Sequence, residues 1–452
     1  MHDADRSAPT DTHTEAPVDL LTELAWRDLV FQCTDEGALR EHLAAEPRRI
    51  YVGFDPTADS LTIGNLVPIL ALVHVARAGH EPIVLMGGGT GLIGDPSGKS
   101  AERQLMTDKQ VAANVERQRG IFERVFANAG LPTPRIVNNL DWLSGLSYIE
   151  LLRDVGKHFS VNMMMQKDSV RSRLEERDQG ISYTEFSYMI LQAYDFLHLH
   201  KAEGVSVQMG GSDQWGNIVA GTDLIRKASD RANQPAMGLT VPLVTKADGG
   251  KFGKTETGAI WLTGPSDGET SSQRTTAYAM HQFWLNTADA DVGRFLRTFT
   301  LLDQDAIESI EAEHEAEPGR RIAQRALADA ATALVHGADE AEAAERAGKA
   351  LFSGDIADLP ERTLMDVLAD VPSSDHERSS LHGEGVDLIE LLIETKLAKS
   401  KREAREFVAN GSVSINGSKC PEGRRVTTGD LLHGRLIALR RGKKAWHLTR
   451  WG

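Results

Sequence analysis

The pattern of apolar and polar positions is clearest between residues 50 and 86. The apolar run Ile50–Phe54 predicts a buried strand, which leads into a polar turn over residues 55–65. A helix is predicted from about residue 63 to residue 78, because apolar side chains recur there at helical spacing, at Leu66, Ile69, Leu70 and Val73. Pro82–Met86 predicts the next strand. Strand, helix and strand within about 35 residues form a βαβ unit, and such units imply a parallel sheet.

The same pattern divides the rest of the chain into segments. Before the βαβ unit, residues 20–43 predict a helical lead-in. After it, short apolar runs predict further strands, separated by helices, at residues 136–138, 205–209 and 239–244. Residues 271–351 are Ala-rich and helical in pattern. Residues 352–385 are irregular in pattern and contain two prolines, which predicts a linker.

The C-terminal segment, residues 386–452, differs from the rest in charge. The whole chain has a formal net charge of −15. Residues 386–452 contain fourteen Lys and Arg but seven Asp and Glu, a net charge of +7 that leaves −22 on the remainder. The pattern over residues 388–416 predicts helix, basic turn, helix and strand. A basic segment on an acidic body is typical of a nucleic-acid-binding module, although a solvated basic surface would show the same charge.

Composition limits the class of protein. A chain of 452 residues with 41% hydrophobic and 25% charged residues predicts two or three globular domains. Two cysteines are too few for a zinc site or a disulfide framework, which favours a reducing compartment. No apolar run is long enough to cross a bilayer, and the polar first 18 residues lack the order of a signal peptide. We therefore expect a disordered N-terminal tail on a cytoplasmic protein without a membrane partner.

Two stretches carry candidate chemistry. Residues 55–65 place small and polar residues where a strand gives way to a helix, so that backbone N–H groups and the helix dipole can bind phosphates. Lys251–Thr255 supplies two ammonium groups in a loop that its glycines leave free to close. Together the two stretches predict stabilisation of charge on a nucleoside triphosphate.

Residues 89–100 contain two partial motifs. Gly89–Gly94 fits the dinucleotide-binding fingerprint, but Asp95 and Pro96 follow where that fingerprint needs a continuing helix. Gly94–Ser100 is similar to a P-loop, but three residues separate its glycines where four are required. Lys99 remains a candidate phosphate contact, and a tight surface turn would explain the stretch equally well.

In their order and spacing, these motifs resemble those of bacterial tyrosyl-tRNA synthetases, which are class I enzymes, from about residue 19 to the C-terminus. The matching stretches are Tyr51–Asp59, Gly87–Ser97, Gly156–Asn162, Tyr183–Tyr188, Gly210–Asn217, Lys251–Thr255 and Arg440–Lys444. The resemblance implies that the tyrosine carboxylate attacks the α-phosphate of ATP. The tyrosyl group would then pass from the adenylate to a ribose hydroxyl at the 3′ end of tRNA(Tyr). No protein nucleophile is needed, so positioning and charge stabilisation would supply the catalysis.

The resemblance also implies a role for each matching residue. The phenol of the substrate would contact Tyr51 and Asp195, and its ammonium group would contact Asp95, Tyr188 and Gln192. Gln214 would lie near its carboxylate. The residues implied for ATP are Asp55, Gly64, Asn65, Asp213 and Lys254. Those implied for stabilising the reacting phosphates are Thr57, Thr62, Asn65, Lys99, Arg103, Lys251, Lys254 and Thr255. Mg²⁺ is expected to accompany ATP, with no metal site on the protein itself. One face of an ordinary helix would also give the spacing of Tyr188, Gln192 and Asp195.

One residue departs from the family pattern. The family signature normally has histidine at both ends of a four-residue stretch, and this chain has Thr62-Ile-Gly-Asn65. Asn keeps a hydrogen-bond donor, but the threonine hydroxyl is shorter than imidazole and cannot carry charge. Removing one transition-state donor costs about 3 kcal/mol. A retuned ligase and a weakly active, inhibitor-tolerant paralogue that acts mainly by binding RNA therefore both stay open, as does a ligase for tryptophan.

The expected architecture is an α/β protein with a Rossmann-like parallel-sheet catalytic domain, a helical domain and a small C-terminal α+β RNA-binding domain. The predicted limits are a tail over 1–18, the catalytic domain over 19–265, an anticodon-facing helical domain over 266–351, a linker over 352–385 and the basic domain over 386–452. The resemblance implies a homodimer and tRNA contacts at Lys399, Lys401, Arg402 and Arg405.

Overall fold

The computed structural model describes residues 19–97, 105–167, 170–171, 174, 181–228, 235–250, 252–255, 258–264, 273–369, 371–442 and 445–452. The chain divides into two compact units, residues 1–254 and 255–452. Among the described helices, none is long and apolar enough to span a membrane.

The first unit is built on a six-stranded sheet with the strand order β1-β6-β5-β2-β3-β4. Its strands are β1 (Gln32–Cys33), β2 (Arg49–Phe54), β3 (Glu81–Met86), β4 (Arg135–Asn138), β5 (Val205–Gly211) and β6 (Met237–Val241). All pairs are parallel except β1 with β6, which is antiparallel. The predicted βαβ unit and the parallel sheet are therefore confirmed.

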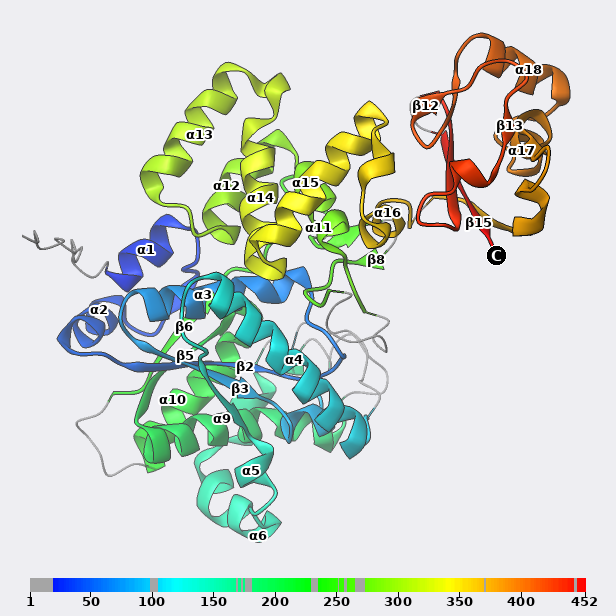
Figure 1. Ribbon diagram of the computed structural model, residues 1–452. Helices are drawn as coiled ribbons and strands as arrows, with labels where there is room; N and C mark the ends of the chain where they lie inside the picture. Colours follow the sequence, from blue (N-terminus) through cyan, green and yellow to red (C-terminus); the bar gives the residue numbers. More distant parts are fainter. Residues whose placement is uncertain are drawn as a thin grey trace, which may run out of the picture. The chain divides into compact units, whose positions relative to one another are not determined.

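The helices of this unit form two layers about the sheet. They are α1 (Leu20–Trp26), α2 (Glu36–Ala45), α3 (Leu66–Arg77), α4 (Asp108–Asn128), α5 (Leu140–Leu143), α6 (Tyr148–Glu150), α7 (Val161–Met165), α9 (Tyr183–Glu203) and α10 (Trp215–Ala228). Figure 1 shows α3 on one face of the sheet and α9 and α10 on the other. Helix α3 is apolar almost all round, and nine of its residues lose nearly all contact with water.

The helical lead-in predicted over residues 20–43 consists of two helices, α1 and α2, with the short strand β1 between them, which was not predicted. Asp19 caps α1 by accepting from Thr22 N, and the chain leaves the helix after Trp26. Asp35 caps α2 by accepting from Ala38 N. Between the two helices, β1 pairs with β6 and forms the edge of the sheet. Asp19 and Asp35 are both favourable N-cap residues, and each marks the start of a separate helix within the predicted segment.

The second unit combines a helical bundle with a C-terminal sheet. The bundle contains α11 (Ala277–Leu285), α12 (Asp289–Phe299), α13 (Gln304–Ala316), α14 (Ile322–His336) and α15 (Ala338–Ser353), which confirms the predicted helical segment. The sheet has the order β12-β11-β14-β15-β9. Its strands are β9 (Ser373–His376), β11 (Val413–Ile415), β12 (Ser418–Lys419), β14 (Leu436–Arg441) and β15 (Ala445–Trp451).

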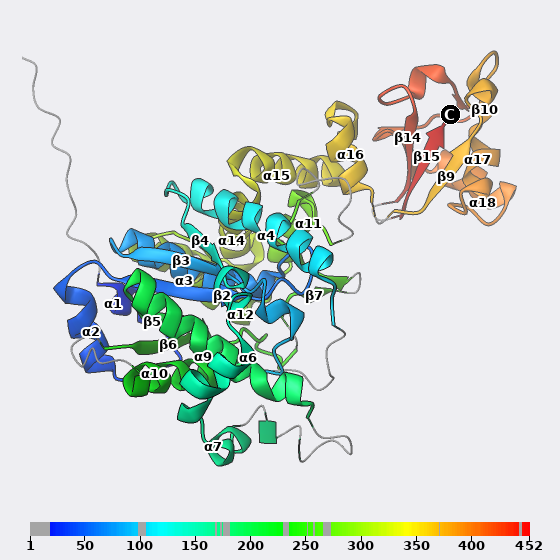
Figure 2. The ribbon, with the colours of Figure 1, turned by 90° about the horizontal axis from the view of Figure 1, so that it is seen from below.

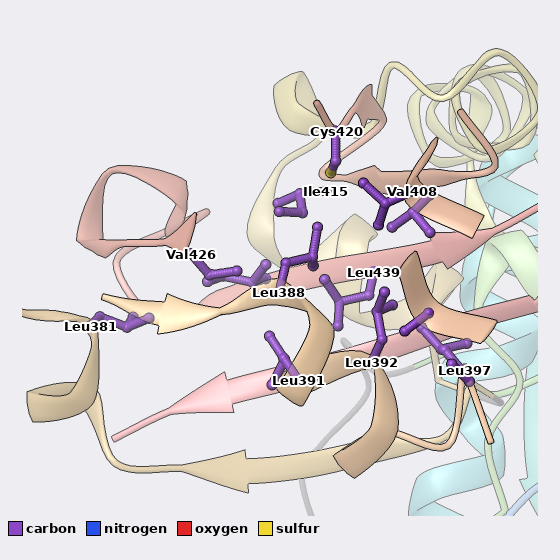
Figure 3. Close-up of a cluster of buried hydrophobic side chains, with 14 of the residues drawn as sticks. Leu381, Leu388, Leu391, Leu392, Leu397, Val408, Ile415, Cys420, Val426 and Leu439 are labelled. Atoms are coloured by element: carbon purple, nitrogen blue, oxygen red, sulfur yellow. The ribbon is translucent and has the colours of Figure 1, made fainter. Parts of the chain in front are cut away.

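The C-terminal module has its own hydrophobic core. Helices α17 (Leu388–Glu394) and α18 (Lys401–Ala409) pack their apolar side chains against β11 and β14. Figure 3 shows these side chains converging, with Leu392, Val408, Ile415 and Leu439 among them. The predicted order of helix, turn, helix and strand is present.

The prediction of an irregular linker over residues 352–385 is wrong. That range contains helix α16 (Glu361–Val367) and strand β9, and β9 pairs in parallel with β15. Leu364 of α16 lies in one hydrophobic cluster with Leu436 and Leu448 of the sheet. The segment therefore supplies both an edge strand and core residues, which the short runs between its prolines did not indicate.

Candidate active site

A cavity of about 550 Å³ lies where the strands β2 and β5 end. Parallel strands present their carboxyl ends at one edge of a sheet, and the loops that follow can converge there. The cavity is lined by most of the residues expected from the sequence: Tyr51, Asp55, Thr57, Thr62, Gly64, Asn65, Asp95, Tyr188, Gln192, Asp195, Asp213 and Gln214. Figure 2 shows α9, which carries three of them, running along the face of the sheet.

Some expected residues cannot be placed in this cavity. Lys99, Arg103 and Lys251 lie outside the described residues. Lys254 and Thr255 form the short strand β7 (Lys254–Thr255), which pairs with β8 (Gly258–Ala259). Their expected contacts with phosphates therefore stay predictions.

Helix α9 sets three cavity residues on one side. Ser182 caps the helix by accepting from Glu185 N at 3.2 Å, and Gly204 ends it in the left-handed conformation. Tyr188, Gln192 and Asp195 follow one another at spacings of four and three, so they lie on the same face. The helix thus presents a phenol, an amide and a carboxylate to the cavity.

Two buried polar residues that line the cavity, Tyr51 and Asp195, lie close enough to interact electrostatically. Tyr51 is 0% exposed, and its hydroxyl has no hydrogen-bond partner among the residues that the structure describes. Burial, together with the nearby Asp195, raises the pKa of Tyr51 well above its usual value. Burial also raises the pKa of Asp195 to about 7, although two hydrogen-bond donors oppose the rise. Such a pair can bind a ligand that both donates and accepts a hydrogen bond.

The two donors to Asp195 were missed by the sequence analysis. Asn139 Nδ2 donates to Asp195 Oδ2 at 2.9 Å, and Trp142 Nε1 donates to Asp195 Oδ1 at 2.7 Å. Both residues come from the segment after β4, and Trp142 stacks on His198 at 4.4 Å between ring centroids. Each oxygen of the carboxylate is therefore fixed in direction. The position of Asn139 just after a strand of the parallel sheet was the signal that could have identified it.

A second network centres on Asp55. Tyr188 Oη donates to Asp55 Oδ2 at 2.8 Å, and Thr90 Oγ1 donates to Asp55 Oδ1 at 2.7 Å. Asn139 Nδ2 in turn donates to Thr90 Oγ1 at 3.0 Å, which joins this network to Asp195. Burial and the neighbouring Asp55 and Asp95 raise the pKa of Tyr188 well above its usual value. Asp55, which was expected to bind ATP, is thus hydrogen-bonded to Tyr188, one of the residues expected to bind the ammonium group.

A third network involves the segment after β5. Gln214 Nε2 donates to Asp95 Oδ2 at 2.7 Å, and Ser97 N donates to Asp95 Oδ1 at 2.9 Å. Asn217 Nδ2 donates to Gln192 Oε1 and to Gln214 Oε1, both at 3.1 Å. Asn217 was not predicted, and it fixes both glutamine amides so that their NH₂ groups point away from it. Asp95, Gln192 and Gln214 therefore form a preorganised polar wall.

The turn between β2 and α3 forms another part of the wall. Thr57 N donates to Asp55 O at 2.8 Å, so that the turn is closed by its own backbone. Residues Ile63–Asn65 form a 3₁₀ turn that continues into α3, with Gly64 exposed between them. Thr62 N and Thr62 Oγ1 both donate to Asn65 Oδ1, at 3.0 and 2.9 Å. The first and last residues of the altered signature are therefore bonded to each other.

The predicted tRNA contacts lie in the second unit, in and before α18. Lys399, Arg402 and Arg405 are exposed, while Lys401 forms an ion pair with Glu390. Ala404 and Val408 on the opposite side of α18 are buried in the module core. The helix thus presents a basic surface to solvent, which suits contact with phosphates.

Comparison with known proteins assigns the chain to a family. Residues 43–353 match the family described as tRNA synthetases class I (W and Y), and residues 364–449 match the Tyrosine--tRNA ligase SYY-like C-terminal domain. The tyrosine–tRNA ligase of Bacillus caldotenax is 51% identical over 438 residues, 96% of this chain and 100% of that protein. The tyrosine–tRNA ligase of Roseiflexus castenholzii is 48% identical over 95% of this chain and 99% of its own length.

A solved structure agrees with this assignment. The C-terminally truncated mitochondrial tyrosyl-tRNA synthetase of Aspergillus nidulans superposes with a TM-score of 0.65 at 30% identity, over 74% of this chain and 94% of that one. The family match covers more than half of the chain, and the relatives align along almost its full length. The chain therefore belongs to the tyrosine–tRNA ligases of the class I tRNA synthetase family.

Proposed function

We propose that the cavity binds tyrosine with its phenol between Tyr51 and Asp195. The observation that carries this proposal is the buried Tyr51 hydroxyl, which has no partner among the described residues and is influenced electrostatically by a carboxylate that two donors fix. The substrate phenol donates to Asp195 and accepts from Tyr51, so that both buried groups are satisfied. Gln208 pairs in register with Tyr51 and so lies beside it. Its buried side-chain oxygen also has no partner in the part of the chain that the structure describes.

The other networks suit the rest of the reaction. The Asp95, Tyr188 and Gln192 oxygens bind the substrate ammonium group, and the Gln214 amide lies near the substrate carboxylate. The substrate carboxylate then forms a bond to the α-phosphorus of ATP, and pyrophosphate leaves with the electrons of the broken P–O bond. The ribose binds near Asp213, and the phosphates bind at the turn carrying Thr57, Gly64 and Asn65. Mg²⁺ enters with the ATP phosphates.

In the second step, a ribose hydroxyl of tRNA(Tyr) attacks the adenylate carbonyl and AMP leaves. We assign tRNA binding to the basic surface in and before α18, with Lys399, Arg402 and Arg405. We assign an anticodon-facing role to the helical bundle.

The domain limits given above remain part of this proposal, except for the corrected segment 352–385. A cytoplasmic location follows from the tRNA partner and the two free cysteines.

Exchange of labelled pyrophosphate into ATP tests the amino acid site. Tyrosine is expected to support exchange, and phenylalanine to support it about 100-fold less well, because its ring leaves Tyr51 and Asp195 unpaired in a buried site. Tryptophan is expected to be inactive, since an indole cannot form hydrogen bonds with both Tyr51 and Asp195. Equal rates with tyrosine and phenylalanine would contradict the assignment. Silence with tyrosine would favour the RNA-binding alternative, which the comparisons do not support.

We also propose a homodimer that forms through an exposed apolar surface on the catalytic unit. The surface consists of side chains that are 38–68% exposed, on α5, α6, the turn after it, α7 and the start of α9: Leu140, Tyr148, Ile149, Leu152, Val161, Met163, Met165 and Tyr183. Figure 1 shows α5 and α6 projecting from the end of the unit. The hydroxyl oxygens of Tyr148 and Tyr183 lie 3.0 Å apart, so α6 and the start of α9 adjoin here. Soluble proteins rarely leave large apolar surfaces in water.

The dimer is expected to dissociate when a charge is placed on this surface. Ile149 is 68% exposed, so Ile149→Asp should leave the fold intact. In the dimer the new carboxylate would lose its hydration, which disfavours association. Light scattering should give twice 49.4 kDa for the natural chain and 49.4 kDa for the variant. Phe31→Asp is the matched control, because Phe31 is 56% exposed outside this surface and should leave the mass unchanged. A natural chain of 49.4 kDa would overturn the proposal.

A further inference from the structure

The hydrogen bonds between Thr62 and Asn65 fix the orientation of the asparagine amide. The backbone N–H of Thr62 can only donate, and it lies 3.0 Å from one terminal atom of Asn65. That atom must therefore be the amide oxygen. The Thr62 hydroxyl lies 2.9 Å from the same oxygen, and because an amide oxygen only accepts, the hydroxyl must donate as well.

The orientation has a consequence for the cavity. With both Thr62 donors on Oδ1, the Asn65 NH₂ group points away from Thr62, and among the described residues no acceptor for it is recorded. Both residues line the cavity. The terminal torsion of asparagine is broad and nearly two-fold, so without partners the amide would present its oxygen as readily as its NH₂. An oxygen facing a phosphate would repel it.

We propose that Thr62 is a positioning residue that acts through Asn65. Its two donors hold the amide so that the NH₂ group faces the phosphates of ATP, and Thr62 itself makes no contact with them. This inference rests on the proposed ATP site. It explains how the chain dispenses with histidine at position 62: the pair provides one oriented neutral donor in place of two independent imidazoles. The β-branched side chain of Thr62 restricts χ1 and keeps its hydroxyl in place.

The test is a double-mutant cycle on adenylate formation measured in single turnovers. Thr62→Val keeps the shape and removes only the hydroxyl, and it is expected to slow the step about 5-fold, in line with the loss of one neutral hydrogen bond. Thr62→Ser restores the hydroxyl and should recover most of the rate. In an Asn65→Ala background, Thr62→Val should cause no further loss, because Thr62 then has nothing to orient.

Two results would overturn the inference. One is an equal 5-fold loss from Thr62→Val in the Asn65→Ala background, which would mean that Thr62 contacts ATP directly. The other is a Thr62→His variant faster than the natural chain, since that would show that position 62 still serves the phosphates by itself. Thermal unfolding of each variant controls for folding, and tyrosine binding without ATP separates failure here from failure of the proposed amino acid site.

Discussion

Asp195→Asn is expected to lower kcat/KM for tyrosine about 1,000-fold when measured well above the pKa of Asp195. Both carboxylate oxygens accept a hydrogen bond, from Asn139 at 2.9 Å and from Trp142 at 2.7 Å. An amide has one oxygen, so in either orientation its NH₂ group faces one of these donors. The hydrogen bond from the substrate phenol to a charged oxygen is lost as well. Together these losses amount to about 4 kcal/mol.

The matched control is Asp141→Asn. Asp141 is exposed on α5 and undergoes the same change in charge, so its kcat/KM should stay within about twofold of the natural value. The variant at position 195 should keep its tRNA binding, because the basic surface is on the other unit. A loss of less than about tenfold at position 195 would mean that the phenol is bound elsewhere.

The second large effect is expected from pH. Burial raises the pKa of Asp195 to about 7, and the substrate phenol needs the ionised form as its acceptor. kcat/KM for tyrosine should therefore approach a tenfold fall for each unit of pH below about 7, which amounts to about 50-fold between pH 7 and pH 5. No histidine is among the described residues that line the cavity, and among them burial raises the pKa of Asp195 to about 7.

The same titration affects stability with a defined sign. The folded chain holds a proton on Asp195 up to about pH 7, whereas the unfolded chain releases it near the usual value of 3.8. Between these values the folded state binds more protons, so this group makes the free energy of unfolding fall as pH rises from about 4 to 7. Asp195→Asn should remove this contribution to the free energy of unfolding.

One result would contradict the kinetic prediction. A pH profile of kcat/KM that is flat from pH 7 to pH 5 would show that the carboxylate of Asp195 is ionised throughout that range.

The parallel sheet could be predicted because its strands carry strong local signals. Ile50–Phe54 and Pro82–Met86 are continuous apolar runs bounded by turn residues, and α3 has a helical apolar repeat. Strands β1 and β9 have two and four residues, too few for any periodicity to be visible. Their existence depends on pairing with distant strands, which a local pattern does not encode.

Most of the residues that line the cavity could be predicted, but not the residues that support them. Tyr51 and Asp95 belong to motifs, whereas Asn139 and Trp142 lie just before and within the short helix α5, outside the matching stretches. Their role follows from the fold, which brings that segment within hydrogen-bonding distance of α9. Thr62 is a different case. The sequence shows that this residue departs from the family signature, but its hydrogen bonds to Asn65 are seen only in the structure.

Strand β9 decides where the chain can be cut for biochemical work. A fragment that begins at residue 386 matches the limits suggested by charge, but it lacks β9 and so exposes the backbone edge of β15. It also uncovers Leu436, Ala438 and Leu448, which pack against Leu364 of α16. Such a fragment would present a bare strand and an apolar sheet face, the combination that promotes aggregation. An expression fragment for isolated tRNA-binding studies should begin before α16, at the end of the helical bundle.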